Sequence, residues 1–265
     1  MGMTGYYVMR GIGRLAFPLF LYFLVQGIHY TRSKPKYFLR IGILAIISEV
    51  PYDMYFYKGF PNWAHQNIFF ELFACLLLIE IFERVLPCNR GGSCNINMES
   101  KQRLDVSDGD GSLTVEPDFC PAYIVFFTAI MCIPAYFLHF SYGFKGIIAT
   151  AFLYKYNQER EQINTLSATS MMTREGTVNR NELDVVDNVD YALTKHRIME
   201  IIYLILACAS LIVTSTKIQY ACLAVIPFIY FCEVKFEKQN RLVQLFTYLF
   251  YPVHILLLYF IGTIL

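Results

Sequence analysis

The sequence predicts an all-α, polytopic integral membrane protein: a bundle of about six to eight transmembrane helices. Two observations predict this fold class. The 265 residues are 56% hydrophobic and only 16% charged, with a mean hydropathy of +0.42, whereas a soluble domain has about 45–50% apolar and about 25% charged residues. The apolar residues also gather in runs close to the ~20 residues that cross a ~30 Å hydrocarbon core.

Eight apolar runs are candidate spans. The fifth is shorter than the others and follows Ser141-Tyr142-Gly143. It is either a span or a tilted, re-entrant segment inside the protein, where backbone that does not span is tolerated. The predicted number of spans is therefore six to eight. The runs cover residues 12–30, 38–57, 66–87, 121–140, 142–156, 198–214, 218–234 and 242–264.

Two polar stretches, 88–120 and 157–197, interrupt this apolar body. They mix Glu, Asp, Asn, Ser and Thr without a period, which predicts flexible loops with little packed structure. Lys and Arg gather next to 157–197, between the first two spans and before the last span. The positive-inside rule therefore places these loops in the cytoplasm and both termini on the other side. We interpret residues 1–265 as one transmembrane domain interrupted by the two loops.

Charge and cysteine spacing exclude several other functions. The net charge of +1 offers no basic field for nucleic acid. Neither H-x-x-x-H nor C-x-x-C occurs, so we expect no metal site. Residues 107–114 resemble the middle of an EF-hand calcium loop, but the positions at its two ends do not carry ligands. We expect a flexible acidic loop there.

Ionisable residues inside spans are the main functional candidates, because each costs a few kcal/mol in hydrocarbon and faces the bundle interior. Arg14, Asp53, Glu71 and His139 fall in the half of the membrane away from the cytoplasm, and His254 falls near its middle. This distribution predicts a polar chamber that opens outward.

Glu49 and Asp53 stand four residues apart, on one face if the helix continues through Pro51. Together with Arg14 they have two interpretations. The carboxylates and the guanidinium fix a cationic or amine-bearing substrate, or they form a structural Arg–carboxylate pair that ties the first two helices together.

His254 also has two interpretations. Its apolar neighbours, Phe250-Tyr251-Pro252-Val253, favour a neutral imidazole, which suits a general base or a transient acyl carrier. Alternatively, the side chain forms a structural hydrogen bond between two helices.

Several segments together resemble the TraX protein family, whose pattern is I-G-R-x-A-F-P-x-F, then G, T-R and Y-x-x-R. The resemblance covers every predicted span except 198–234, in the same order. The matching segments are Gly11-Ile12-Gly13-Arg14-Leu15-Ala16-Phe17-Pro18-Leu19-Phe20, Gly27, Thr31-Arg32, Tyr37-Phe38-Leu39-Arg40, Ile47-Ser48-Glu49-Val50-Pro51-Tyr52-Asp53, Asn67-Ile68-Phe69-Phe70, Tyr142-Gly143-Phe144-Lys145-Gly146-Ile147 and Phe250-Tyr251-Pro252-Val253-His254.

This resemblance implies a multi-span acetyltransferase of the bacterial cytoplasmic (inner) membrane. The acyl donor would be acetyl-CoA, and the acceptor an amine or hydroxyl group of a protein or small molecule, such as a pilin-like amino terminus. His254 would deprotonate the acceptor, and Arg14 would steady the thioester oxygen or the donor phosphates. Glu71 completes the expected catalytic set. The expected substrate-binding residues are Glu49, Asp53, Asn67, His139 and Tyr142.

The chain departs from the family pattern at three points. The family has one more span before the G-R-x-A-F-P motif, carrying an Asp-His pair, and we expect that span to be missing here. Ser141 stands where the family has Asp before Tyr-Gly. Glu71 replaces the Thr that follows the Asn-x-x-Phe motif.

Two other function classes remain open from the residues alone. In a transporter or permease, the same buried charges would form a substrate or proton path. In a scaffold or receptor, the cytoplasmic loops would bind partners.

Overall fold

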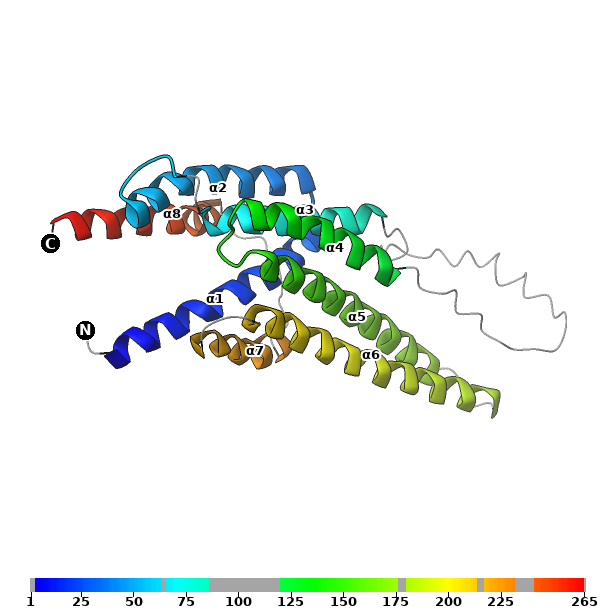
Figure 1. Ribbon diagram of the computed structural model, residues 1–265. Helices are drawn as coiled ribbons and strands as arrows, with labels where there is room; N and C mark the ends of the chain where they lie inside the picture. The colour runs from blue at the N-terminus through cyan, green and yellow to red at the C-terminus, as the bar shows by residue number, and fades with distance from the viewer. Residues whose placement is uncertain are drawn as a thin grey trace.

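The computed structural model describes residues 3–62, 65–85, 120–175, 180–213, 217–231 and 241–264. Every regular element in these ranges is a helix, so the predicted all-α class is confirmed. Long helices lie alongside one another, and the two chain termini lie at the same end of the molecule (Figure 1). The elements are α1 (Met3–Tyr30), α2 (Lys34–Tyr57), α3 (Ile68–Val85), α4 (Cys120–Phe137), α5 (Phe144–Glu175), α6 (Arg180–Ile212), the 3₁₀ helix η3 (Lys217–Ala224), α7 (Val225–Phe231) and α8 (Arg241–Ile264).

Five of the eight predicted apolar runs coincide with one α-helix each, α1 to α4 and α8, and the run 198–214 corresponds to the second half of α6. The agreement has a local cause, since an apolar run that satisfies its own backbone hydrogen bonds does so as a helix. Within the described ranges, no helix has both the length and the apolar content needed to cross a bilayer.

The predicted flexible loop at 157–197 is wrong. Helix α5 continues without a break to Glu175, and α6 begins at Arg180 and packs along it. Polar side chains pair across this hairpin: His196 Nδ1 lies 2.6 Å from Glu159 Oε2, and Arg160 Nε lies 3.8 Å from Glu200 Oε1. A helix without an apolar stripe is stable when such pairs support it, which is why the sequence pattern concealed these helices.

Two further predictions change. The fifth run is the first half of the continuous helix α5, not a short re-entrant segment. The seventh run, 218–234, is divided into η3 and α7. Pro227 lies in the first turn of α7, where the missing N–H of proline costs no hydrogen bond. The same proline would interrupt a helix that continued from η3. The other predicted loop, 88–120, lies outside the described residues up to Cys120, where α4 begins.

The core lies where α1, α3 and α5 pack against one another. Each fully buried Leu or Ile contributes about 1.5–3 kcal/mol by leaving water, so these three helices form the rigid centre of the molecule. Fully buried members are Phe17, Leu21 and Ile28 of α1, Leu76, Leu78, Ile79 and Phe82 of α3, and Ile147 and Tyr156 of α5.

Polar groups are left to the two ends of this core. We call the end with the α2–α3 connection (58–67) and the α4–α5 connection (138–143) the loop end, and the end with the α1–α2 turn (31–33) the cleft end. At the cleft end, Ser33 precedes α2 in an extended conformation and a proline follows in the first turn, which fixes where the chain reverses.

Arg160 joins α5 to the end of α7, and its loss should be costly. Its guanidinium donates to the carbonyls of Ile229 at 3.3 Å and Tyr230 at 3.4 Å, and it lies beside the buried Glu200. Arg160→Leu should lower the free energy of unfolding by about 1–3 kcal/mol, because buried acceptors lose their donor. Chemical unfolding of the purified protein measures this.

The matched control is Arg84→Leu, whose side chain is 74% exposed. Its effect should stay within about 0.5 kcal/mol. Equal effects of the two substitutions would show that Arg160 contributes no more than a surface charge.

Candidate functional site

At the loop end, the structure brings together three residues predicted from the sequence. Arg14 Nη1 of α1 donates to the Tyr142 hydroxyl at 3.3 Å, and the guanidinium lies 5.6 Å from the centroid of that ring. The backbone N–H of Tyr142 donates to Glu71 Oε2 of α3 at 2.9 Å. Arg14, Tyr142 and Glu71 therefore form one continuous chain of contacts.

The carboxyl group of Glu71 is closed off from solvent. Glu71 is fully buried, and its Oε1 atom has no hydrogen-bond partner among the described residues. Gly146 packs directly on it, since a Cβ at this position would overlap Oε1. Phe17 stacks on Tyr142 with centroids 3.7 Å apart. The predicted outward-opening chamber is therefore closed at Glu71.

Asn67 anchors the start of α3 to α2. Its side-chain amide donates to Glu49 Oε2 at 2.6 Å and to the Ala45 carbonyl at 2.7 Å. Its Oδ1 accepts the Phe69 N–H at 2.8 Å, the bond expected of a helix N-cap. Glu49 and Asn67 are thus engaged with each other and with backbone.

Asp53 has a similar role one turn further along α2. It is fully buried, and its Oδ2 accepts the backbone N–H of Asn62 at 2.8 Å. Both carboxylates of α2 therefore hold the 58–67 connection. In the described contacts Arg14 binds Tyr142 and neither Glu49 nor Asp53, so the predicted Arg–carboxylate tie between α1 and α2 is not formed.

The two predicted histidines lie apart from these groups. His139 is exposed, and its ring meets that of His65 edge-on at 5.9 Å. His254 Nδ1 donates to the Phe250 carbonyl of its own helix at 2.9 Å, and its ring packs against Phe250 and Tyr251. No described contact joins His254 to Arg14 or Glu71.

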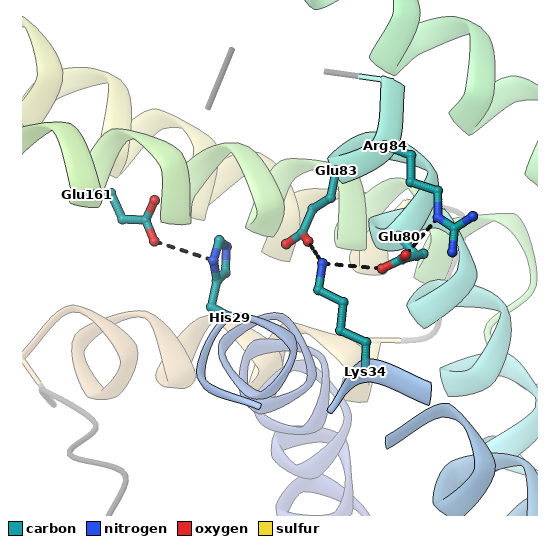
Figure 2. Close-up of polar contacts among 6 residues, drawn as sticks. All are labelled: His29, Lys34, Glu80, Glu83, Arg84 and Glu161. Carbon is teal, nitrogen blue, oxygen red and sulfur yellow. Dashed lines mark hydrogen bonds and ion pairs between the residues drawn. The ribbon is translucent and has the colours of Figure 1, made fainter. Parts of the chain in front are cut away.

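A second polar group surrounds a cleft at the other end. The cleft has a volume of about 1190 Å³ and lies where α1 ends, α2 begins and α3 ends, with α5 as its fourth wall (Figure 2). Its charged and amide-bearing lining residues are His29, Arg32, Lys34, Glu80, Glu83, Arg84, Gln158, Glu161 and Asn164.

On one side of the cleft the charges neutralise one another. Figure 2 shows the Lys34 ammonium between Glu83, with which it forms an ion pair, and Glu80, 3.4 Å away. Arg84 Nε donates to Glu80 Oε1 at 2.7 Å. This network fixes α2 against the last turns of α3.

On the other side, His29 faces Glu161. His29 Nδ1 lies 3.5 Å from Glu161 Oε1, while its buried Nε2 atom has no hydrogen-bond partner among the described residues. Burial raises the pKa of the Glu161 carboxyl; His29 opposes this shift and Glu83 adds to it. The 3.5 Å separation is an ion-pair distance, longer than a hydrogen bond. An imidazole beside a carboxylate, with its second nitrogen unpaired, is part of the arrangement of a general base.

The sequence pattern identified only one of these two residues as a candidate. His29 is visible as an ionisable residue at the end of a span, but Glu161 falls in the stretch predicted to be a flexible loop. The available signal was spacing: Gln158 and Glu161 are three residues apart, as are Glu80 and Glu83, so each pair occupies one helical face.

No group of three or more His, Cys, Asp or Glu residues within the described ranges is arranged to hold a metal ion. The EF-hand-like segment at 107–114 lies outside the described residues.

Comparison with known proteins identifies the family. The family model described as TraX protein matches residues 3–177. The chain belongs to the TraX protein family. No curated protein and no solved structure matches the chain.

The match to the TraX family covers α1 to α5. It therefore includes the Arg14–Tyr142–Glu71 contacts and both members of the His29–Glu161 pair. His254 lies outside it, so its assigned role rests on the short segment at 250–254.

Gly146 should not tolerate a side chain. In Gly146→Ala the new methyl group would overlap Glu71 Oε1 and lie 3.0 Å from Phe17 Cζ. We expect a loss of about 1–3 kcal/mol in the free energy of unfolding, the usual cost of overpacking. Chemical unfolding tests this.

Gly13→Ala is the control, because its Cβ would meet nothing within 4 Å. That variant should be neutral or more stable by up to about 1 kcal/mol. A Gly146→Ala protein as stable as wild type would contradict the close packing on Glu71.

Proposed function

We propose that this TraX protein is a membrane-bound acyltransferase that moves an acetyl group from acetyl-CoA to an amine or hydroxyl acceptor. The reaction class follows from the family, which is known for pilin acetylation. The observation that supports this site is the His29–Glu161 pair. Both residues line a cleft large enough for a substrate, and the buried Nε2 of His29 has no hydrogen-bond partner among the described residues.

In the proposed step, His29 Nε2 takes the proton of the acceptor N–H or O–H group. The acceptor atom attacks the carbonyl carbon of the thioester, and the C–S bond breaks. The departing thiolate takes the proton back from the imidazolium, so His29 returns to its starting state. Glu161 holds the ring and stabilises its cationic form, the role of the carboxylate in a catalytic triad.

The residues predicted from the sequence keep a proposed role at the loop end. Arg14 lies 15 residues before His29 on α1, about 22 Å away. Arg14, Glu71 and Tyr142 would therefore hold a part of the acceptor remote from its reacting N–H or O–H group, with Glu49, Asp53, Asn67 and His139 around it. His254 is the alternative base. The cleft is favoured for the chemistry because Glu71 is covered and His254 is bonded to its own helix.

The membrane assignment is supported by exposed apolar side chains. Large apolar residues are exposed along the outer faces of α2, α4 and α8, and contiguous patches of this kind mark lipid or protein contact. Examples are Leu39, Ile43, Ile46 and Ile47 on α2, Val125, Phe126, Ile133 and Phe137 on α4, and Phe250, Val253, Leu257 and Phe260 on α8.

Transfer of labelled acetyl groups tests the function. Purified wild type is incubated with radiolabelled acetyl-CoA and amine, hydroxyl or peptide acceptors. His29→Gln should lower the rate about 10²–10⁴-fold, the usual contribution of a general base. Glu161→Gln should lower it at least about tenfold, because the ring loses its orienting charge.

His196→Gln is the matched control, since His196 also pairs with a glutamate, at 2.6 Å, but on the α5–α6 hairpin. Its rate should equal that of wild type. His254→Ala and Glu71→Gln are assayed alongside; a large loss in His254→Ala with a normal His29→Gln would transfer the base assignment to His254. If folded wild type transfers no label but takes up a substrate into proteoliposomes without CoA, the transporter interpretation replaces this one.

Membrane attachment is tested by fractionation. The full chain should stay in the membrane pellet through washes with alkaline carbonate and high salt, and leave it only with detergent, because apolar contact does not depend on charge. Release by salt or carbonate alone would contradict the proposal that the exposed faces of α2, α4 and α8 contact lipid.

A further inference from the structure

The inner wall of the cleft carries amide groups that have no partner. Gln158 is only 5% exposed, yet neither its side-chain nitrogen nor its oxygen has a hydrogen-bond partner among the described residues. On the neighbouring residue, Asn157, the side-chain oxygen accepts from Gln26 Nε2 at 2.6 Å, but the side-chain nitrogen is likewise unpaired. Folded proteins rarely leave buried amides unpaired.

These two residues line adjoining cavities. Gln158 lines the main cleft, and Asn157 lines a second cavity of about 490 Å³. The two cavities share Tyr30, Glu161 and Asn164 as lining residues, so they meet beside the His29–Glu161 pair. A ligand that extended across both cavities would lie beside Gln158, Asn157 and the His29–Glu161 pair, and would reach their buried polar atoms after small side-chain movements.

The charges that line the cleft indicate how a ligand would be oriented in it. Lys34 and Arg84 together balance Glu80 and Glu83, and Glu161 pairs with His29, so the buried Gln158 offers neutral hydrogen-bonding groups in the cleft lining. Arg32 is an exposed cationic residue of the cleft lining, and the Arg84 side chain is exposed as well, although its Nε is bonded to Glu80. The complementary ligand is an elongated molecule with neutral amides inside and negative charge outside.

We propose that the cleft binds an acyl-CoA by its pantetheine arm, and that Gln158 is the residue that recognises an amide of this arm. The inference rests on the proposed acetyl transfer. Each amide of the arm has one N–H donor and one carbonyl acceptor, which a carboxamide side chain pairs with in full. The phosphates then lie toward Arg32 and Arg84, and the thioester lies toward His29.

Binding of CoA itself tests this without requiring turnover. Isothermal titration of the full chain is done with CoA, with pantetheine, which has the amides but no phosphates, and with adenosine 3′,5′-bisphosphate, which has phosphates but no amides. Gln158→Leu should weaken CoA and pantetheine binding about tenfold or more, the effect of losing a paired hydrogen bond in a buried site, and leave the bisphosphate unchanged. Arg32→Gln combined with Arg84→Gln should weaken the binding of CoA and of the bisphosphate and leave pantetheine binding unchanged.

The Gln158→Leu variant should fold, because it removes an unpaired polar group and keeps the side-chain size. Gln162→Leu is the matched control, an exposed glutamine one turn further along α5 that should bind all three probes as wild type does. The inference would be overturned if Gln158→Leu bound CoA and pantetheine with wild-type affinity. It would also be overturned if this variant lost affinity only for a peptide acceptor.

The two proposals fail in different ways. If wild type transfers acetyl groups and Gln158→Leu keeps both the KM for acetyl-CoA and the affinity for CoA, the binding site is wrong and the function stands. If CoA binds in a Gln158-dependent way but no acetyl group is transferred, the function is wrong and the binding site stands. A folded wild type that binds none of the three probes overturns both.

Discussion

The shared apolar core of α1, α3 and α5 is the constraint on which the other features depend. Residues such as Leu21, Leu76 and Ile147 are fully buried in it, so the three helices cannot separate without exposing apolar surface to water or lipid headgroups. Their polar residues are consequently displaced to the two ends. The Arg14–Tyr142–Glu71 contacts form where α3 and α5 begin beside α1, and the cleft around His29 forms where α1 and α3 end beside α5.

The hydrogen bonds of each polar side chain indicate whether it supports the fold or is a candidate for chemistry. Asn67 has its oxygen and nitrogen engaged, one capping α3 and the other bonded to Glu49, and such a satisfied network stabilises a connection. Gln158 and His29 have buried atoms without partners beside an open cleft. Glu71 is between these cases, since one oxygen is unpaired but Gly146 covers it. All of these unpaired atoms are buried among the described residues, and what distinguishes His29 and Gln158 is that their side chains line a cleft.

The α5–α6 hairpin shows why apolar patterning finds only part of such a fold. The first half of α5 is apolar and was predicted as a span or a re-entrant segment. The second half is polar and is held by pairs such as His196 with Glu159, whose partner lies on the other helix. Because the stabilising contact is across the hairpin, no window of local sequence contains it. The same continuation of α5 brings Glu161 to His29, so the error in the fold and the missed site had one cause.

By itself, the sequence determined the helical class, the positions of five helices and membership of the TraX family. These properties are local: a run of apolar residues forms its backbone hydrogen bonds within itself, and a motif is read along the chain. Only the tertiary structure decided which polar side chains meet. Arg14 and Tyr142 are 128 positions apart, and His29 reaches Glu161 from a different helix. Such contacts depend on how the helices pack and where each one ends. The whole core sets this packing, and no single segment of it does so alone.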